Sequence, residues 1–262
     1  MQFVKGGPDI DERLLQAHED GQVVFFCGAG ISYPAGLPGF AGLTRRLYNE
    51  LNPSETATER AALKGGAFDT AISLLESKLI GGRARVRREM ASILMPHSLP
   101  PRATETQKCI LQLSMAQDGK CRLVTTNFDR LFEDERERLN VKRYQAPLLP
   151  VPKNRWEGLV YLHGLLSEGL TDSELNQLIL SSGDFGLAYL TERWAARFIT
   201  ELFRSYTVCF VGYSLSDPVL RYMMDALAAD RLLGEKPIEA FAFGNYAKGK
   251  CEQAEAEWRA NQ

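Results

Sequence analysis

The stretch Val23-Val24-Phe25-Phe26-Cys27-Gly28-Ala29-Gly30-Ile31-Ser32 decides the fold. Its first five residues form a continuous apolar run, which is typical of a strand buried on both faces of a parallel sheet. The glycines that follow let the backbone approach a phosphate, and a helix that starts there would offer free N–H groups. The usual dinucleotide fingerprint has another glycine where Tyr33 stands. By itself the turn is therefore as consistent with a plain strand-to-helix connection as with a phosphate site.

Strand-like runs return in series further along the chain. They are Arg122–Thr126, Leu159–Leu162, Leu178–Leu180, Val208–Val211 and Ala240–Phe243. Helical patterns are found at Asp9–Asp20, Phe128–Leu139, Leu187–Ser205 and Asp217–Ala229. Strands that alternate with helices predict an α/β fold with a doubly wound, Rossmann-like parallel sheet covered on both faces.

The domain organisation follows from the stretch Gly42–Gln117, which reads as helices without a convincing strand. We expect a sheet domain over residues 1–41 and 119–247, with residues 42–118 inserted as a helical lobe. The charged segment 248–262 reads as a C-terminal helix that could lead into a further domain of a longer protein. Arginines 83, 85, 87 and 88 fit a solvated face of a lobe helix, with a contact to a partner chain or nucleic acid as the less favoured alternative.

Charge and hydropathy exclude several classes of protein. The 262 residues carry 31 basic and 33 acidic side chains, so the net charge of −2 gives no general attraction for nucleic acid. No apolar run approaches the roughly 20 residues that cross a bilayer, and the N-terminus has no signal-peptide core. We therefore expect a cytoplasmic protein that does not engage a membrane.

A metal site is not expected. The five cysteines make no C-x-x-C pair, and Cys27, Cys121 and Cys209 lie in or beside apolar runs, where a reduced cysteine behaves as a small buried hydrophobe. The three histidines are dispersed at positions 18, 97 and 163. Neither residue type has the spacing of a zinc site.

Four segments in order resemble the sirtuin family. The run from Gly28 to Phe40 resembles its G-A-G-I-S-x-x-x-G-I-P-D-F-R signature, and Thr125-Thr126-Asn127-Phe128-Asp129 resembles T-Q-N-I-D. Leu162-His163-Gly164 is similar to the family's catalytic H-G, and the segment from Val211 to Asp217 is similar to G-T-S-L. The resemblance implies NAD as substrate.

The chain also departs from the sirtuin deacylases. Those enzymes usually carry a four-cysteine zinc module after the catalytic histidine, but the interval from His163 to Val208 contains no cysteine. The aspartate and arginine of the first signature are replaced by Gly39 and Ala41. The short segment from Gln177 to Phe185 stands where the zinc module would be, with Asp184 read as a turn residue. This pattern looks like the sirtuin-like domains of bacterial anti-phage defence proteins, which hydrolyse NAD.

The resemblance implies catalytic roles for Asn127, His163 and Asp129. Asn127 would hold ribose hydroxyls or a water, although from its position alone a helix N-cap is the favoured explanation. His163 would be a general base, and its ordinary pKa of about 6.5 suits proton exchange near neutrality. Asp129 would orient the loop or bind a ribose hydroxyl, or it would be an acid in a first helical turn.

The expected NAD-binding residues surround these three. They are Gly28, Ala29, Gly30, Ile31, Ser32, Pro38, Phe40, Thr126, Gly212, Ser214, Leu215, Asp217 and Gly244. If the glycine turn contacts the pyrophosphate, Gly30→Val should abolish NAD binding with little change in thermal stability.

The function that the resemblance implies is cleavage of the nicotinamide–ribose bond of NAD, as the NAD-depleting domain of a defence protein that acts as a homo-oligomer or within a larger complex. A protein deacylase or ADP-ribosyltransferase is one alternative, which the missing zinc module disfavours. A non-catalytic sensor of NAD or ADP-ribose is another, which the retained Asn127 and His163 disfavour.

Overall fold

The computed structural model describes residues 1–51, 54–153, 156–213 and 240–244, together with five single positions. Those positions are Met223, Lys250, Glu252, Gln253 and Ala256. The predicted strand Ala240–Phe243 is among the described residues, whereas the predicted helix Asp217–Ala229, except for Met223, and most of the segment 248–262 lie outside them. Within the described chain, no helix is both long and apolar enough to cross a membrane.

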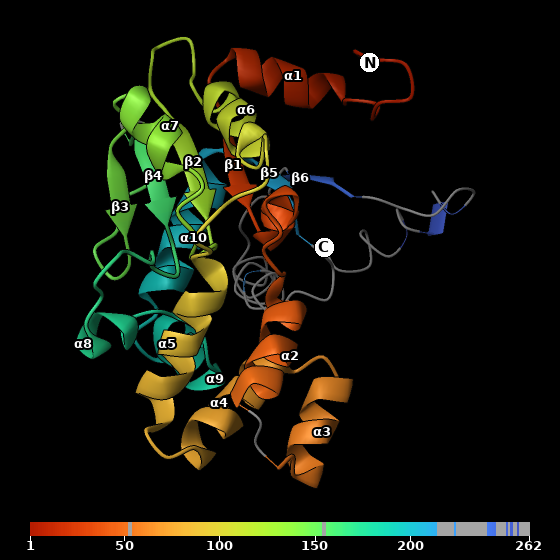
Figure 1. Ribbon diagram of the computed structural model, residues 1–262. Coiled ribbons are helices and arrows are strands. Elements are labelled where there is room, and N and C mark those ends of the chain that lie inside the picture. The colour runs from red at the N-terminus through yellow and green to blue at the C-terminus, as the bar shows by residue number, and fades with distance from the viewer. Residues whose placement is uncertain are drawn as a thin grey trace.

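Six parallel strands form one sheet in the order β3-β4-β2-β1-β5-β6, which confirms the predicted α/β fold (Figure 1). The strands are β1 (Val23–Cys27), β2 (Arg122–Thr125), β3 (Arg143–Gln145), β4 (Gly158–Tyr161), β5 (Thr207–Val211) and β6 (Ala240–Phe243). The chain leaves β1 for β2 on one side and places β5 on the other, so the strand order reverses beside β1. In parallel α/β sheets, ligands bind outside the carboxyl ends of the strands near such a reversal.

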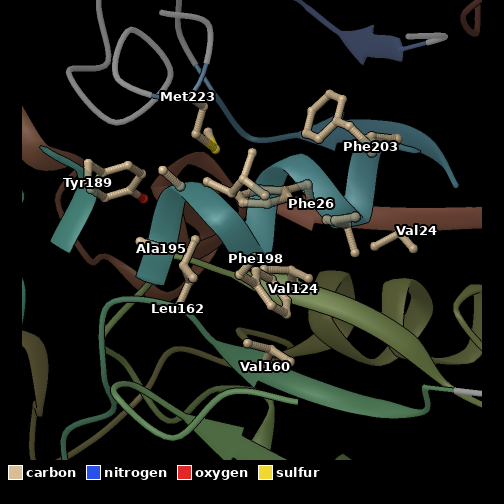
Figure 2. Packing of buried hydrophobic residues seen from close by; sticks show 14 of the residues in the cluster. Val24, Phe26, Val124, Val160, Leu162, Tyr189, Ala195, Phe198, Phe203 and Met223 are labelled. Atoms are coloured by element: carbon tan, nitrogen blue, oxygen red, sulfur yellow. The ribbon is translucent and has the colours of Figure 1, made fainter. Parts of the chain in front are cut away.

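Helices cover both faces of the sheet. On one face lies α10 (Trp194–Ser205), whose Phe198 and Phe203 pack over Val24 and Phe26 of β1 and over Val124 (Figure 2). On the other face lie α1 (Glu12–Glu19), α6 (Glu105–Leu113) and α7 (Glu133–Arg138). Successive residues of β1 alternate between these two clusters and all are buried, which is why the strand reads as an unbroken apolar run.

The helical lobe packs beyond the carboxyl ends of the strands (Figure 1). It contains α2 (Phe40–Leu51), α3 (Ala57–Lys64), α4 (Phe68–Lys78) and α5 (Gly82–Leu94), whose apolar faces form one cluster. Phe128, Leu166, Leu175, Leu178 and Leu180 join the same cluster from outside the lobe. Helix α6 packs on the sheet instead, through Ile110 and Leu111.

Several predicted elements are wrong in extent or type. Leu178–Leu180 is an irregular segment between α8 (Asp172–Leu175) and α9 (Ser182–Phe185) rather than a strand, and the short edge strand β3 was not predicted. Helix Phe128–Leu139 is reduced to α7. Helix Leu187–Ser205 is divided into a π-helix, η2 (Gly186–Thr191), and α10, because Arg193 takes a left-handed backbone with φ of 58°.

Candidate functional site

Asn127 lies just past the carboxyl end of β2 and is buried. Its Nδ2 donates to Gly28 O and to Ser32 Oγ, each at 3.2 Å. Both amide hydrogens are therefore used inside the protein, and Oδ1, which has no hydrogen-bond partner among the described residues, is the atom left for a ligand. The alternative explanation as a helix N-cap is wrong, because α7 begins only at Glu133.

Ser32 and Asp129 continue this hydrogen-bonded chain. Ser32 Oγ donates to Asp129 Oδ2 at 2.7 Å, and the N–H of Leu131 donates to Asp129 Oδ1 at 3.1 Å. Burial raises the pKa of the Asp129 carboxyl, and the two hydrogen bonds oppose that rise. Asp129 precedes α7 by four residues, so its interpretation as an acid in a first helical turn is also wrong.

The glycine turn holds the ends of β1 and β5 together. A Cβ on Gly30 would stand 2.8 Å from Gly212 O and 2.9 Å from Gly212 Cα, and the N–H of Gly30 donates to Gly212 O at 2.8 Å. Gly212 has φ of 76°, a left-handed conformation that favours glycine. The glycines therefore serve the approach of two backbones, and a larger residue at position 30 must displace one of them. This close approach contradicts the expectation that Gly30→Val changes thermal stability little.

The turn also leaves few N–H groups for a phosphate. The element after Gly28 is a seven-residue 3₁₀ helix, η1 (Ala29–Ala35), rather than an α-helix. The N–H groups of Gly28, Gly30 and Ile31 already donate to Val211 O, Gly212 O and Gly28 O. Ala29 retains the one N–H in Gly28–Ile31 that has no partner in the described part of the chain.

His163 follows β4 and is 2% exposed. Its Nε2 lies 2.9 Å from the hydroxyl of Tyr189, and its ring lies edge-to-face against Phe185 at 5.2 Å between centroids. Burial lowers the pKa of His163 to about 3, and the negative charge of Asp184 opposes this only in part. The imidazole is therefore neutral at pH 7, and the expectation of proton exchange near neutrality is wrong for the ligand-free protein.

A buried ion-pair network fixes the segment that packs on His163. Arg87, on α5, is fully buried and donates from Nε to Glu76 at 2.9 Å, from Nη2 to Asp184, and from Nη1 to Leu175 O at 2.8 Å. Arg83 pairs with Asp184 at 2.5 Å. The interpretation of the arginine run as a solvated face is therefore wrong for Arg87.

Asp184 is the centre of this network. Burial raises the pKa of its carboxyl, but Arg87, the backbone N–H groups of Ser181 and Leu180, and Arg83 outweigh it, so the pKa is lowered below its ordinary value. The residue caps α9 and ties the segment to the lobe, which sequence reasoning missed when it took Asp184 for a turn residue.

One pocket at the carboxyl ends of β1, β2 and β4 brings together Asn127, Asp129 and His163. Its open space is about 540 Å³, a volume that includes the solvent-filled mouth. Of the expected site residues, it is lined by Ala29, Ser32, Pro38, Phe40, Thr126, Asn127, Asp129 and His163. Thr126 is held there by a 2.7 Å hydrogen bond to the hydroxyl of Tyr213.

Other expected site residues are placed differently. Gly28, Gly30, Ile31 and Gly212 form the backbone contact behind the pocket rather than its lining. Gly244 is exposed and follows the edge strand β6. Ser214, Leu215 and Asp217 lie outside the described residues.

The lining also contains residues that were not predicted. They are Leu37, Leu43, Leu94, Phe128, Ile179 and Phe185. Leu43 and Leu94 belong to amphipathic lobe helices, and an apolar period shows which face is buried but not that part of this face borders a ligand pocket. Among the described residues, no group of three or more His, Cys, Asp or Glu side chains could hold a metal ion.

Comparison with known proteins agrees with this geometry. A family model described as a SIR2-like domain matches residues 122–262, more than half of the chain. The chain belongs to the SIR2-like family. The match confirms the resemblance to sirtuins and indicates an NAD-related activity for this SIR2-like domain.

A curated relative is similar over almost the whole chain. The uncharacterized protein y4cA of Sinorhizobium fredii (strain NBRC 101917 / NGR234) is 34% identical over 268 residues, which cover 97% of this chain and 21% of the relative. The chain thus spans about a fifth of the length of that relative.

Proposed function

We propose that this SIR2-like domain is an NAD glycohydrolase that releases nicotinamide and ADP-ribose. The observation that carries the proposal is the convergence of Asn127, Asp129 and His163 on one pocket from two strand ends. The strand register accounts for this convergence, because Thr125 at the end of β2 pairs with Cys27 of β1 and with Tyr161 of β4. One ligand of the size of nicotinamide riboside could therefore contact all three side chains.

The chemistry of the lining suits the nicotinamide end of NAD rather than its phosphates. Leu37, Phe40, Ile179 and Phe185 offer apolar surface to an aromatic ring. No arginine or lysine is among the lining residues that the structure describes, whereas Asp129 is. A positively charged pyridinium beside a buried carboxyl favours the ionised form of that carboxyl, so ligand and Asp129 would stabilise each other.

In the proposed reaction, the bond between ribose C1′ and the pyridinium nitrogen breaks, and its electron pair leaves with neutral nicotinamide. A water oxygen bonds to C1′, and the proton of that water goes to solvent. Oδ1 of Asn127 accepts from a ribose hydroxyl or from the water, which orients the attack. His163, neutral and buried, accepts a hydrogen bond from the same water or hydroxyl. Because its pKa is so low, His163 mainly orients the water or hydroxyl and does not deprotonate it. Attack on an oxocarbenium-like ribose needs little help from a base.

We further propose that the domain is the NAD-consuming part of a larger defence protein, acting in an oligomer or complex. The support is the absence of cysteine between His163 and Val208, together with a relative about five times as long as the matched segment.

The test is nicotinamide release from NAD alone by the purified protein, followed by chromatography. We expect Asn127→Ala and His163→Ala each to lower kcat by about a hundredfold or more while much of the NAD affinity remains. Since the two residues act on one step, the double variant should be little worse than either single one. Asn49→Ala and His97→Ala, at exposed positions, are the matched controls.

The outcomes separate the candidate functions. Folded single variants with parental turnover would contradict the catalytic assignment. Release only after an acyl-lysine peptide is added would indicate a deacylase, and tight NAD binding without release would indicate a sensor.

A further inference from the structure

Tyr189 lies in an unusual helical turn beside His163. The six-residue π-helix η2 lies between α9 and α10, and the N–H of Glu192 donates to Leu187 O, five residues earlier, at 2.9 Å. π-turns are rare and often mark functional sites. Tyr189 is 3% exposed, and its hydroxyl is 2.9 Å from His163 Nε2.

The same segment packs two adjacent aromatic rings against the imidazole. Phe185 and Tyr189 both meet the His163 ring edge-to-face, at interplanar angles of 85° and 80°. Phe185 directly follows Asp184, which Arg87 and Arg83 tie to the lobe. The ring plane of His163 is therefore fixed by packing, and Tyr189 supplies the polar contact at Nε2.

A neutral imidazole carries one N–H and one lone pair, so the contact at Nε2 decides what the other nitrogen can do. If the tyrosine hydroxyl donated to Nε2, the proton would sit on Nδ1 and the ring would have no acceptor for a substrate. If Nε2–H donates to the tyrosine oxygen, Nδ1 keeps its lone pair. In the described part of the chain, Nδ1 has no hydrogen-bond partner.

We propose that Tyr189 is a positioning residue that accepts a hydrogen bond from Nε2–H of His163 and thereby makes Nδ1 the acceptor that faces substrate. This rests on the proposed NAD hydrolysis. The π-helical turn would then select the tautomer of His163 that is protonated on Nε2. Nδ1 would be the ring nitrogen that accepts a hydrogen bond from the substrate.

The experiment uses ¹⁵N-histidine-labelled protein, in which only three histidines give signals and His163→Gln identifies that of position 163. In the parent we expect the proton of His163 on Nε2. Tyr189→Phe, which keeps the aromatic ring, should shift the proton partly to Nδ1 and lower kcat for nicotinamide release by about tenfold to a hundredfold, with KM little changed. Tyr206→Phe is the control, because it also removes a tyrosine hydroxyl that makes a hydrogen bond, in this case to Lys153 O at 2.9 Å.

A parent proton on Nδ1, or a Tyr189→Phe variant with the parental tautomer and kcat, would overturn the proposal. If the parent releases no nicotinamide, the proposed function fails, while the nitrogen signals still decide whether Tyr189 sets the tautomer. A fall in thermal stability equal in Tyr189→Phe and Tyr206→Phe, with kcat reduced only in the former, is the result expected for a positioning role.

Discussion

The two walls of the pocket are held in different ways. The strand-end wall, residues 28–32 and 126–129, is fixed by hydrogen bonds between neighbouring loops, from Asn127 to Ser32 and Gly28 and from Ser32 to Asp129. The segment wall, residues 178–191, is fixed by a buried ion-pair network whose arginines come from the lobe. The first wall depends on the sheet register, and the second depends on the docking of two separate parts of the chain. A substitution that destabilises one wall should therefore leave the contacts of the other wall intact.

The largest effect is expected at the segment wall. Arg87→Met removes the fully buried cation that Glu76 and Asp184 share and leaves them only the half-buried Arg83, which should lower the free energy of unfolding by about 3–5 kcal/mol. Arg88→Met is the control on the same helix, since its ion pair with Asp172 is solvent-exposed and worth at most about 1 kcal/mol. Urea unfolding measures both. If both variants lose the same free energy of unfolding, the buried ion-pair network does not stabilise the segment wall more than an exposed ion pair does.

At the strand-end wall we expect a smaller loss. Gly30→Ala places a Cβ within 3.0 Å of the Gly212 backbone, so the ends of β1 and β5 must separate, at a cost of about 1–3 kcal/mol. Gly183→Ala is the matched control, because its Cβ meets nothing within 4 Å and alanine suits helix α9 better than glycine. Thermal unfolding should show a loss for the first variant and none for the second. A Gly30→Ala protein as stable as the parent would show that the turn can open freely.

The smallest expected effect is the change in stability with pH that arises from His163. The pKa of His163 is about 3 when folded and about 6.5 when unfolded, so between these values only the unfolded chain binds the proton. Stability therefore falls as pH falls through this range, by at most about 1.4 kcal/mol per pH unit from this group. The carboxyl of Asp129, whose pKa is raised, acts in the opposite direction, but it is the same in every variant.

Urea unfolding at pH 7, 6 and 5 tests this. His163→Gln should lose less stability than the parent as pH falls, and His97→Gln, at an exposed position, should keep the parental dependence. If the free energy of unfolding depends on pH equally in the parent and in His163→Gln, burial does not lower the pKa of His163.

The strand-end wall was largely predictable, and the segment wall was not. Residues 125–129 carry a motif next to a strand, and a parallel sheet brings such strand ends together whatever lies between them. The motif gave the identity of Asn127, Asp129 and His163, but not the hydrogen bonds that leave only one atom of Asn127 for a ligand. In the segment wall, the apolar run Leu178–Leu180 was taken for a strand, because a short buried run has no period that separates a strand from an irregular segment packed on a helix.

The amino-acid sequence by itself determined the parallel sheet, its buried strands and the family, because apolar runs and motifs are local and their strand ends converge by topology. Only the tertiary structure decided that Arg87 is buried rather than solvated, that Gly30 rests on Gly212, and that His163 is neutral against Phe185 and Tyr189. Each of these depends on which residue far along the chain comes within a few ångströms. Burial and charge pairing set the ionisation of a side chain, and both belong to its neighbours rather than to its place in the sequence.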